Sequence, residues 1–492
     1  QVEKVRQLEP LPDIDFNIRA GNTLIGFTSL DEIKRAAKYK PKDQIGLLFG
    51  ETLDAIQQIE EDAETVARAF QTFHTMQTEH GMDAQQFSDA KQQLRDRLQS
   101  LTDRLDHYLA SEYVINPDKS PKKYQQWRIS HQPFHWFAEF YEIMHRGGFD
   151  VIIGNPPYVV YSPSKVAYSL EEVGYQTIST KNLYALTFER SLHLAKGLGP
   201  VGFIVQLTAL SSGRMKPLQD MLLERGKLYA LSFPRRPESM FDGVEMPVSI
   251  LLSFGDQKRQ LLTSRIGRIY TEERPVALST IALMPHQIRI DSYRLGKIGN
   301  PIEHEIYQKI SGLKKPLNSL TTNQGTHNIV YYQEACRYWL KACEGLPYFK
   351  RNGISIRPPH GRVINFKSQE AAAIVGCILN SSFFYWYYSI FSDCEHVNDE
   401  LVRDLKIPPN WKKSAWHPLS QRLQKNLDTN SSRKEIKTKQ GHRIEYDEIK
   451  AFLAKNIIDE VDTALAEHYN FTDEELDFII NYDIKYRMSL SG

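Results

Sequence analysis

The sequence lacks long apolar segments and has few cysteines. No run approaches the roughly 20 apolar residues that a membrane-spanning helix needs, and the N-terminus has no basic-then-apolar signal pattern. These absences predict a cytoplasmic protein with no membrane partner. The cysteines form neither a C-x-x-C pair nor the Cys/His spacing of a zinc site, so we expect structural thiols in a reduced compartment and no metal. They are Cys336, Cys343, Cys377 and Cys394.

A strong excess of positive charge is also missing. The 492 residues carry a formal net charge of +1, which argues against a uniformly basic nucleic-acid binder. The distribution is nevertheless uneven: residues 51–113 hold 13 acidic and 5 basic residues, whereas residues 401–450 hold 6 acidic and 12 basic residues. A polyanion such as a nucleic acid would be attracted to the second stretch and repelled by the first. The alternative is that both stretches are simply solvated surfaces.

The beginning of the chain lacks a methionine. The sequence opens on Gln1, and its first predicted element is a short β-like run over residues 15–19, so we expect a further segment upstream. A chain of 492 residues with 41% hydrophobic residues is long enough for about three domains with real cores.

Two long helices are predicted near the N-terminus. Apolar residues recur at spacings of three and four over residues 53–73 and again over residues 94–109, which is typical of helical faces. Gly81 and Asp83 separate the two stretches, so we expect an antiparallel helical hairpin inserted at about residues 45–115. An aromatic-rich helix is expected to follow over residues 127–141.

Residues 149–254 alternate between strands and helices. The alternation predicts a mostly parallel sheet covered on both faces, and its last two strands, with no helix between them, predict an antiparallel edge. The expected strands are 149–153, 201–207, 228–233 and 248–254, and the expected helices are 182–196 and 215–225.

A different composition begins at about residue 276. Segments punctuated by proline and glycine and rich in Tyr, Trp and Arg predict a separate α+β domain over residues 276–450. Within it, the polar and basic tract 412–445 is expected to be a surface loop or arm. Residues 451–492 return to an amphipathic helical pattern.

The feature that carries chemistry is Asn155-Pro156-Pro157-Tyr158, directly after the first predicted strand. Loops at the carboxyl ends of such strands line the ligand crevice. An aromatic amine attacks a methyl group poorly unless acceptors hold its hydrogens and favour a tetrahedral nitrogen. The Asn155 side-chain carbonyl and the rigidly held Pro156 backbone carbonyl are two such acceptors. Tyr158 offers a flat face on which a base taken out of a duplex can stack.

This tetrad resembles the catalytic motif of amino-group methyltransferases, which is found in DNA adenine enzymes and in some RNA and protein-glutamine enzymes. Further stretches are similar to those of Eco57I-like, type IIG restriction-modification methylases. They are DFNIRAGNTLIG at 15–26, KNLYALTF at 181–188, MFDGVEMPV at 240–248, LNSSFFYWYY at 379–388 and DEELDFIINYDIKYRM at 473–488.

The resemblance implies three parts. Residues 1–275 would form a Rossmann-like methyltransferase sheet, incomplete at the N-terminus, residues 276–450 a target recognition domain, and residues 451–492 a helical segment. The implied activity is methyl transfer from S-adenosylmethionine to the N6 amine of adenine in double-stranded DNA by base flipping. The setting would be a restriction-modification or related phage-defence system, with a nuclease domain or subunit as a further partner of the full-length parent.

The resemblance also assigns two single residues. Asn22 would contact the adenine amine of the cofactor, and the alternative is that it caps a turn. Phe241 would be a second aromatic face against the flipped base, and the alternative is a core residue. Nothing in the sequence matches the family's glycine-rich cofactor loop or the acidic residue that follows its second strand. We therefore expect the activity to belong to the full-length parent.

Alternatives remain open at this stage. Methylation of RNA or of protein glutamine, and a non-catalytic DNA-recognition fragment, are the competing functions. We expect basic residues interleaved with aromatic residues to recognise the DNA target sequence. The candidates are Arg351, Arg357, His360 and Arg362. A nuclease-like pattern of Asp13 with Glu32 and Lys34 is expected to be accidental, because Asp13 adjoins the first predicted strand and Glu-Ile-Lys recurs at 435 and 448.

Overall fold

The computed structural model describes residues 17–38, 45–78, 84–162, 164–286, 289–290, 293–411 and 413–488. The chain is a mixed α/β protein of two compact units, each with its own hydrophobic core. The first unit is Gln1–Phe203 with Asp220–Gly226 and Leu252–Lys258, and the second is Ile204–Gln219 with Lys227–Leu251 and Arg259–Gly492. Over the described ranges, no helix combines the length and the apolar character that crossing a bilayer requires.

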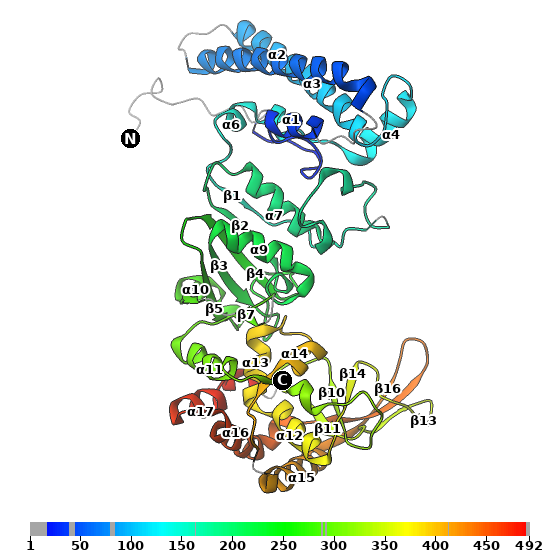
Figure 1. Cartoon of the computed structure of the whole chain (residues 1–492), viewed down its shortest axis with the longest axis vertical. Coiled ribbons are helices and arrows are strands. Elements are labelled where there is room, and N and C mark those ends of the chain that lie inside the picture. The colour runs from blue at the N-terminus through cyan, green and yellow to red at the C-terminus, as the bar shows by residue number, and fades with distance from the viewer. Residues whose placement is uncertain are drawn as a thin grey trace. The chain divides into compact units, whose positions relative to one another are not determined.

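A helical hairpin forms much of the first unit. The two long helices lie side by side (Figure 1), and the predicted apolar positions Ile59, Val66, Leu94 and Leu101 are buried between them and their neighbours. The structure thus confirms the two helices predicted from periodicity. The helices of this region are α1 (Leu30–Lys38), α2 (Ile45–Thr78), α3 (Ala84–Glu112), α4 (Pro121–His131), α5 (Trp136–Glu139) and α6 (Tyr141–His145).

The single aromatic helix predicted over residues 127–141 is wrong. Gln132 adopts a left-handed conformation that ends α4, and the following backbone is extended. This stretch bonds to a distant loop instead of to itself: the Phe134 N–H donates to the Ile25 carbonyl at 2.7 Å and the Phe137 N–H to the Phe27 carbonyl at 3.1 Å. Tertiary pairing therefore overrides the local helical pattern.

The strand predicted over residues 15–19 lies partly outside the described residues. In its described part, Asn17 is in a turn and residues 18–20 have no regular structure. The nearest β interaction is an isolated bridge between Asn22 and Pro133.

Six strands form a mixed sheet in the order β1-β2-β4-β3-β5-β6. β1 pairs with β2 in parallel, β3 with β5 in parallel, and β5 with β6 antiparallel. The strands are β1 (Ile152–Gly154), β2 (Val201–Gln206), β3 (Gly226–Phe233), β4 (Val248–Gly255), β5 (Gln260–Ile266) and β6 (Met284–His286), and the helices between them include α7 (Leu183–Leu194), α8 (Thr208–Ser211) and α9 (Lys216–Arg225).

Two expectations about this sheet are wrong. The strands β3 and β4 were expected at an antiparallel edge, but β4 lies inside the sheet between β2 and β3, and two unpredicted strands continue it. The sheet was expected to be covered on both faces, but at β1 and the residue before it Ile153 is 80% exposed and Val151 is 58% exposed. The physical reason is that β1 is the edge strand of this sheet within the described residues, so its apolar side chains lack neighbours on one side.

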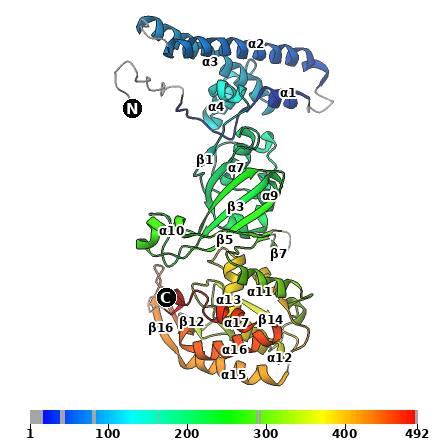
Figure 2. The same ribbon diagram turned by 90° about the vertical axis from the view of Figure 1, so that its left-hand side faces the viewer.

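The second unit continues with small sheets packed around a helical core. Ten consecutive residues of α13 (Ser382–Phe391) are buried, so the segment 379–388 that resembles a recognition-domain stretch is core. The surrounding helices are α10 (Arg274–Thr280), α11 (Pro301–Ser311), α12 (Gln369–Asn380), α14 (Asp399–Asp404), α15 (Lys413–Thr429), α16 (Lys455–Tyr469), α17 (Asp473–Ile480) and α18 (Ile484–Arg487). Figures 1 and 2 show α12, α15, α16 and α17 gathered together.

The small sheets have the orders β11-β10-β14, β13-β12-β17-β16, β15-β9 and β7-β8. Their strands are β7 (Arg289–Ile290), β8 (Arg294–Leu295), β9 (Lys315–Pro316), β10 (Ile329–Gln333), β11 (Ala342–Glu344), β12 (Phe349–Arg351), β13 (Ile354–Ser355), β14 (Gly361–Asn365), β15 (Lys406–Ile407), β16 (Ser431–Lys437) and β17 (Arg443–Ile449). The tract 412–445 is therefore not a loop: its described residues form a helix and a β-hairpin, and the hairpin is an arm.

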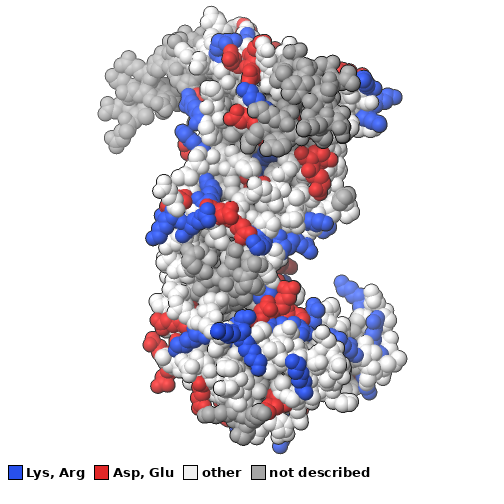
Figure 3. All heavy atoms as spheres, in the orientation of Figure 1, with Lys and Arg blue, Asp and Glu red and all other residues white. Residues whose placement is uncertain are grey.

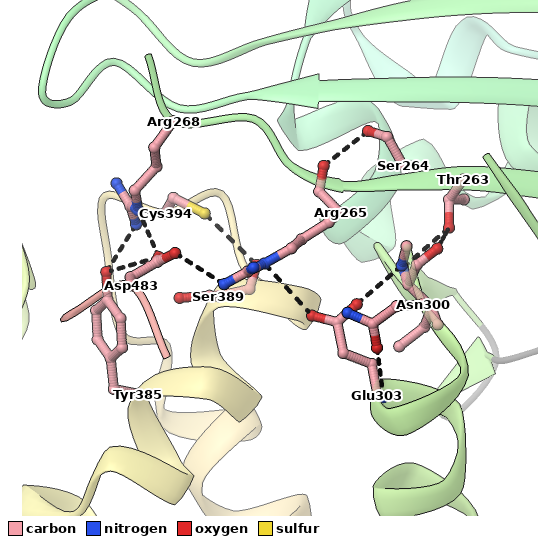
Figure 4. Close-up of polar contacts among 12 residues, drawn as sticks. Thr263, Ser264, Arg265, Arg268, Asn300, Glu303, Tyr385, Ser389, Cys394 and Asp483 are labelled. Atoms are coloured by element: carbon pink, nitrogen blue, oxygen red, sulfur yellow. Dashed lines mark hydrogen bonds and ion pairs between the residues drawn. The ribbon is translucent and has the colours of Figure 1, made fainter. Parts of the chain in front are cut away.

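A buried charge network joins the C-terminal segment to the end of β5 and the residues that follow it (Figure 4). The Arg268 Nε donates to Asp483 at 2.7 Å, and Arg265 donates to the other oxygen of that carboxylate at 3.1 Å. Arg268 also donates to the Tyr385 hydroxyl at 2.8 Å. The side chains of Arg268 and Asp483 are only 2% and 4% exposed, so each needs the other as its counter-charge.

The cysteines match their prediction. All four are free and buried, as expected of structural thiols. Burial raises the pKa of Cys336, Cys343 and Cys377 to about 12, which keeps these thiols protonated and unreactive. No group of His, Cys, Asp and Glu side chains suited to a metal ion occurs in the ranges that the structure describes.

Candidate active site

The loop 155–158 follows the carboxyl end of β1. Because β1 runs parallel to β2, with Ile152 opposite Val201, the loops after both strands emerge at the same edge of the sheet. Asn155 and Pro157 are exposed, Tyr158 is half-buried and Pro156 is buried. The Asn155 carboxamide of the predicted tetrad is thus accessible to solvent, whereas the following Pro156 is buried.

The backbone after the tetrad is held by the start of α7. The Leu183 N–H donates to the Val159 carbonyl at 3.0 Å, and the Tyr161 N–H donates to the Lys181 carbonyl at 2.9 Å. Asn182 caps α7 by accepting the Tyr184 N–H through its side chain at 3.3 Å. The structure therefore brings the tetrad together with the stretch 181–188, two segments that the sequence singled out separately.

Tyr158 is positioned by an aromatic neighbour. Its ring centroid lies 6.2 Å from that of the completely buried Tyr184, with the planes at 89°, an edge-to-face contact. Burial raises the pKa of Tyr158, so its hydroxyl stays protonated at neutral pH. The residue can present an uncharged aromatic ring beside Asn155.

Asn155 and Pro156 have unused acceptors. Within the part of the chain that the structure describes, neither the Asn155 side chain nor the Pro156 carbonyl takes part in a hydrogen bond. Two carbonyl acceptors on consecutive residues are therefore available to an external amine. Just before them, a Cβ added to Gly154 would lie 2.9 Å from the Phe203 ring, so the strand end packs closely onto β2.

Sequence reasoning missed two buried charges on α7. Glu189 accepts the N–H groups of Gln176 and Thr177 at 2.9 and 2.8 Å and the Thr177 hydroxyl at 2.6 Å, which organises the loop before α7. Arg190 donates to the Tyr175 hydroxyl at 2.7 Å and to the Leu24 carbonyl at 3.2 Å. The available signal was a Glu-Arg pair inside an otherwise apolar helical stretch.

Asn22 lies in the loop that Arg190 holds. Its side-chain oxygen accepts the Leu24 N–H at 3.2 Å, and its own N–H donates to the Gln132 carbonyl at 2.8 Å. Asn22 therefore caps a turn, as its alternative interpretation stated, and its assignment to a cofactor remains a prediction.

Phe241 belongs to the second unit. It is half-buried in the loop between β3 and β4, where its carbonyl accepts the Val244 N–H at 3.3 Å. Arg274 steadies this loop by donating to the Ser239 carbonyl at 2.9 Å. The proposed role of Phe241 against a base likewise remains a prediction.

The predicted base-reading candidates differ in how they are engaged. Arg362 forms an ion pair with Glu334, and Arg357 donates to the Gly361 carbonyl at 2.8 Å. Arg351 and His360 are exposed, and His360 has a left-handed backbone. Arg362 and Arg357 thus already have intramolecular partners, whereas Arg351 projects from β12.

The Asn155-Pro-Pro-Tyr158 loop after β1 lies within a stretch of the chain that matches a known methylase family. Residues 48–238 match the family of Eco57I restriction-modification methylases, which confirms the resemblance predicted from the sequence. The matched stretch contains the tetrad 155–158 and the start of α7, but neither Asn22 nor Phe241.

The chain is also similar to single proteins. Over 273 residues, or 49% of its length, it is 25% identical to a putative type II restriction enzyme and methyltransferase of Methanocaldococcus jannaschii, and it covers 22% of that relative. The type IIL restriction-modification enzyme MmeI in complex with DNA is 11% identical, with a TM-score of 0.41 over 78% of this chain and 63% of MmeI. A nuclease-deletion mutant of the type ISP enzyme LlaGI with a DNA substrate mimic is 11% identical, with a TM-score of 0.34 over 60% of this chain and 36% of that one. The two structural likenesses are too distant to carry a functional conclusion.

Proposed function

We propose that this chain carries the target-amine half of a site-specific DNA methyltransferase that modifies the N6 amine of adenine in a restriction-modification system. The observation that carries the proposal is the exposed Asn155 carboxamide with the unused Pro156 carbonyl, fixed beside Tyr158 by the start of α7. The match of residues 48–238 to restriction-modification methylases supports the same reading.

The residues would act on a base taken out of the duplex. The Asn155 and Pro156 carbonyls would each accept one N–H of the exocyclic amine, which favours a tetrahedral nitrogen whose lone pair is free to attack. The Tyr158 ring would stack on the base and offset part of the cost of extrusion, since such stacking contributes about 1 to 3 kcal/mol. Phe241 is proposed as a second stacking residue.

S-adenosylmethionine, when bound, would supply the methyl group. The described residues fit the acceptor side of this chemistry, because the Asn155 side chain is exposed and neither its carbonyl nor that of Pro156 has a hydrogen-bond partner within the described residues. The fit on the cofactor side rests on Asn22 alone, whose side-chain oxygen already accepts the Leu24 N–H. Its amide could therefore contact the cofactor only while the turn 22–24 is kept.

The decisive experiment changes Asn155→Ala in the full chain and measures transfer of a labelled methyl group to duplex DNA. We expect a loss of about 100-fold or more, the usual effect of removing one preorganised polar contact. The fold should be unchanged because the side chain is exposed. Gln126→Ala removes another exposed carboxamide, on α4, and should leave the rate at the wild-type value.

The competing functions give different results in the same assay. Equal rates for Asn155→Ala and Gln126→Ala would refute the proposed role of the tetrad. Transfer to structured RNA or to protein glutamine in preference to duplex DNA would move the substrate to those classes. Binding of DNA by the wild-type chain without any transfer would favour a recognition fragment.

A further inference from the structure

The hairpin of β16 and β17 is the arm of the second unit. In Figures 1 and 2 it lies beside β12 and β13 on one flank of that unit, and Figure 3 shows Lys and Arg side chains over this flank. Seven residue pairs join the two strands, from Ser431 opposite Ile449 to Lys437 opposite Arg443. We divide it into a tip, residues 437–442, and a shaft, residues 431–436 and 443–449.

The charges of the shaft neutralise one another. Arg433 pairs with Asp447 at 2.5 Å, and Arg443 pairs with Glu435 at 2.8 Å and with Glu445 at 3.4 Å. On the opposite face, Lys434 lies 3.6 Å from Glu448. Every acidic residue of the shaft is thereby engaged, and little net field remains along it.

The tip has the opposite character. Lys437 and Lys439 are exposed, Gln440 between the strands is exposed, and the six residues include no acid. Within the described residues neither lysine has an ion pair. The tip is therefore one place where the positive charge of residues 401–450 is available to a partner.

A second turn stiffens the tip. Asn352, at the turn between β12 and β13, exchanges backbone bonds with the end of the arm: its N–H donates to the Arg443 carbonyl at 2.8 Å, and its side-chain oxygen accepts the Arg443 N–H at 2.9 Å. Its amide also lies 3.1 Å from the His442 ring. The base of the tip, at His442 and the adjoining Arg443, is thus tied to the neighbouring turn.

One row of the sheet below the tip is rich in isoleucine. The pairing register puts Ile436, Ile444, Arg351 and Ile354 in one row across the four strands. Ile354 is 67% exposed and Ile436 is 48% exposed. Burying these side chains against a partner would be favourable.

We propose that the arm enters a groove of duplex DNA, with Lys437 and Lys439 on phosphates and Gln440 at the base edges. The proposal rests on the proposed function. Beyond the four-stranded row that ends at Ile436 and Ile444, the tip is a two-stranded turn of the width that the major groove admits. Glutamine is suited to the paired acceptor and donor of adenine. The row of isoleucines would meet sugars and thymine methyl groups beside the tip.

The pattern of charge favours DNA over a protein partner. An interface between proteins gains most of its affinity from aromatic and Arg side chains buried at its centre. Two unpaired lysines at the end of a neutral shaft are instead suited to bind the phosphates on either side of a groove. Lysine contacts to phosphate release counter-ions, and each is expected to change the dependence of affinity on salt by a fixed amount.

The test measures binding of the full chain to a labelled duplex of mixed sequence over a series of salt concentrations. For Lys437→Gln combined with Lys439→Gln, the slope of log affinity against log salt should become less steep by about two, close to one for each phosphate contact. Lys434→Gln, which removes a lysine already paired with Glu448, should leave the slope unchanged. Equal slopes for the tip variant and the wild-type chain would overturn the proposal.

A second measurement follows Gln440→Ala. Random duplexes retained by the wild-type chain and by the variant are sequenced; the variant should keep the wild-type salt slope and lose preference at one base position by about tenfold or more. Unchanged preference would overturn the reading role of Gln440. Methyl transfer by Asn155→Ala separates the two proposals. If Asn155→Ala loses transfer and the lysines of the tip still set the salt slope of DNA binding, both proposals are supported. If Asn155→Ala transfers normally and the lysines of the tip still set the salt slope, only the catalytic proposal is refuted.

Discussion

Asp483 supplies the carboxylate that neutralises Arg268 in the buried charge network. Replacing Asp483 by asparagine tests how much this charge contributes to the free energy of unfolding. Asparagine keeps the size, one acceptor oxygen and the tolerance of the left-handed conformation that residue 483 adopts. The substitution therefore removes the charge and little else. It leaves the Arg268 guanidinium, 2% exposed, without a carboxylate.

Breaking a buried ion pair from one side costs about 3 to 5 kcal/mol, because the remaining charge stays buried. Arg265 adds little to this figure, since its side chain is 40% exposed and water screens it. The hydrogen bond from Arg268 to Tyr385 and the retained Asn oxygen reduce the loss, so we expect about 3 kcal/mol for Asp483→Asn.

The assay is urea unfolding followed by tryptophan fluorescence, which reports on the buried Trp386 and Trp416 of the same core. Asp473→Asn is the matched control, an exposed acid at the start of α17 whose loss should cost under about 1 kcal/mol. If both variants unfold at the same urea concentration, the reasoning that Arg268 depends on a counter-charge is refuted.

Two further predictions concern stability. Glu303 is buried, and burial raises its pKa from 4.5 to about 7. Its contribution to stability is therefore full below pH 4.5 and is lost as the pH rises through 7. Relative to Glu303→Gln, the wild-type free energy of unfolding should fall by roughly 2 to 3 kcal/mol between about pH 5 and about pH 8, and an equal difference at both values would contradict this. Gly26 has a φ of +131°, and an added Cβ would lie 2.2 Å from the Phe134 carbonyl oxygen; Gly26→Ala should therefore lower the melting temperature of the first unit more than Gly174→Ala, where φ is also positive but the space is open, and equal shifts would show that the close approach is unimportant.

Local patterns in the sequence predicted the local elements well. The hairpin of α2 and α3, the helix α7 and the strands β2, β3 and β4 follow periodicity that neighbouring residues alone determine. The order of the strands could not be predicted in this way, because the interior position of β4 and the added β5 depend on pairing between residues far apart in the chain.

The candidate site likewise has a part that neighbouring residues predict and a part that depends on distant segments. The tetrad 155–158 was predicted because its residue types carry a recognisable chemistry. Its neighbours Glu189 and Arg190 were not, since a buried charge in a helix gains its meaning only from the loops that reach it, such as the Leu24 carbonyl. The break of the aromatic helix at Gln132 has a similar origin, because a distant loop supplies its hydrogen-bond partners.

The separation of the arm's tip from the helical core also affects how this protein can change over evolution. Residues 437–440 are mostly exposed and lie outside the hydrophobic core, so substitutions there should alter the free energy of unfolding by no more than about 0.5 kcal/mol. Changes in α13 would disrupt the packing of the whole second unit. New variants of the arm can therefore accumulate while the scaffold beneath them stays constant.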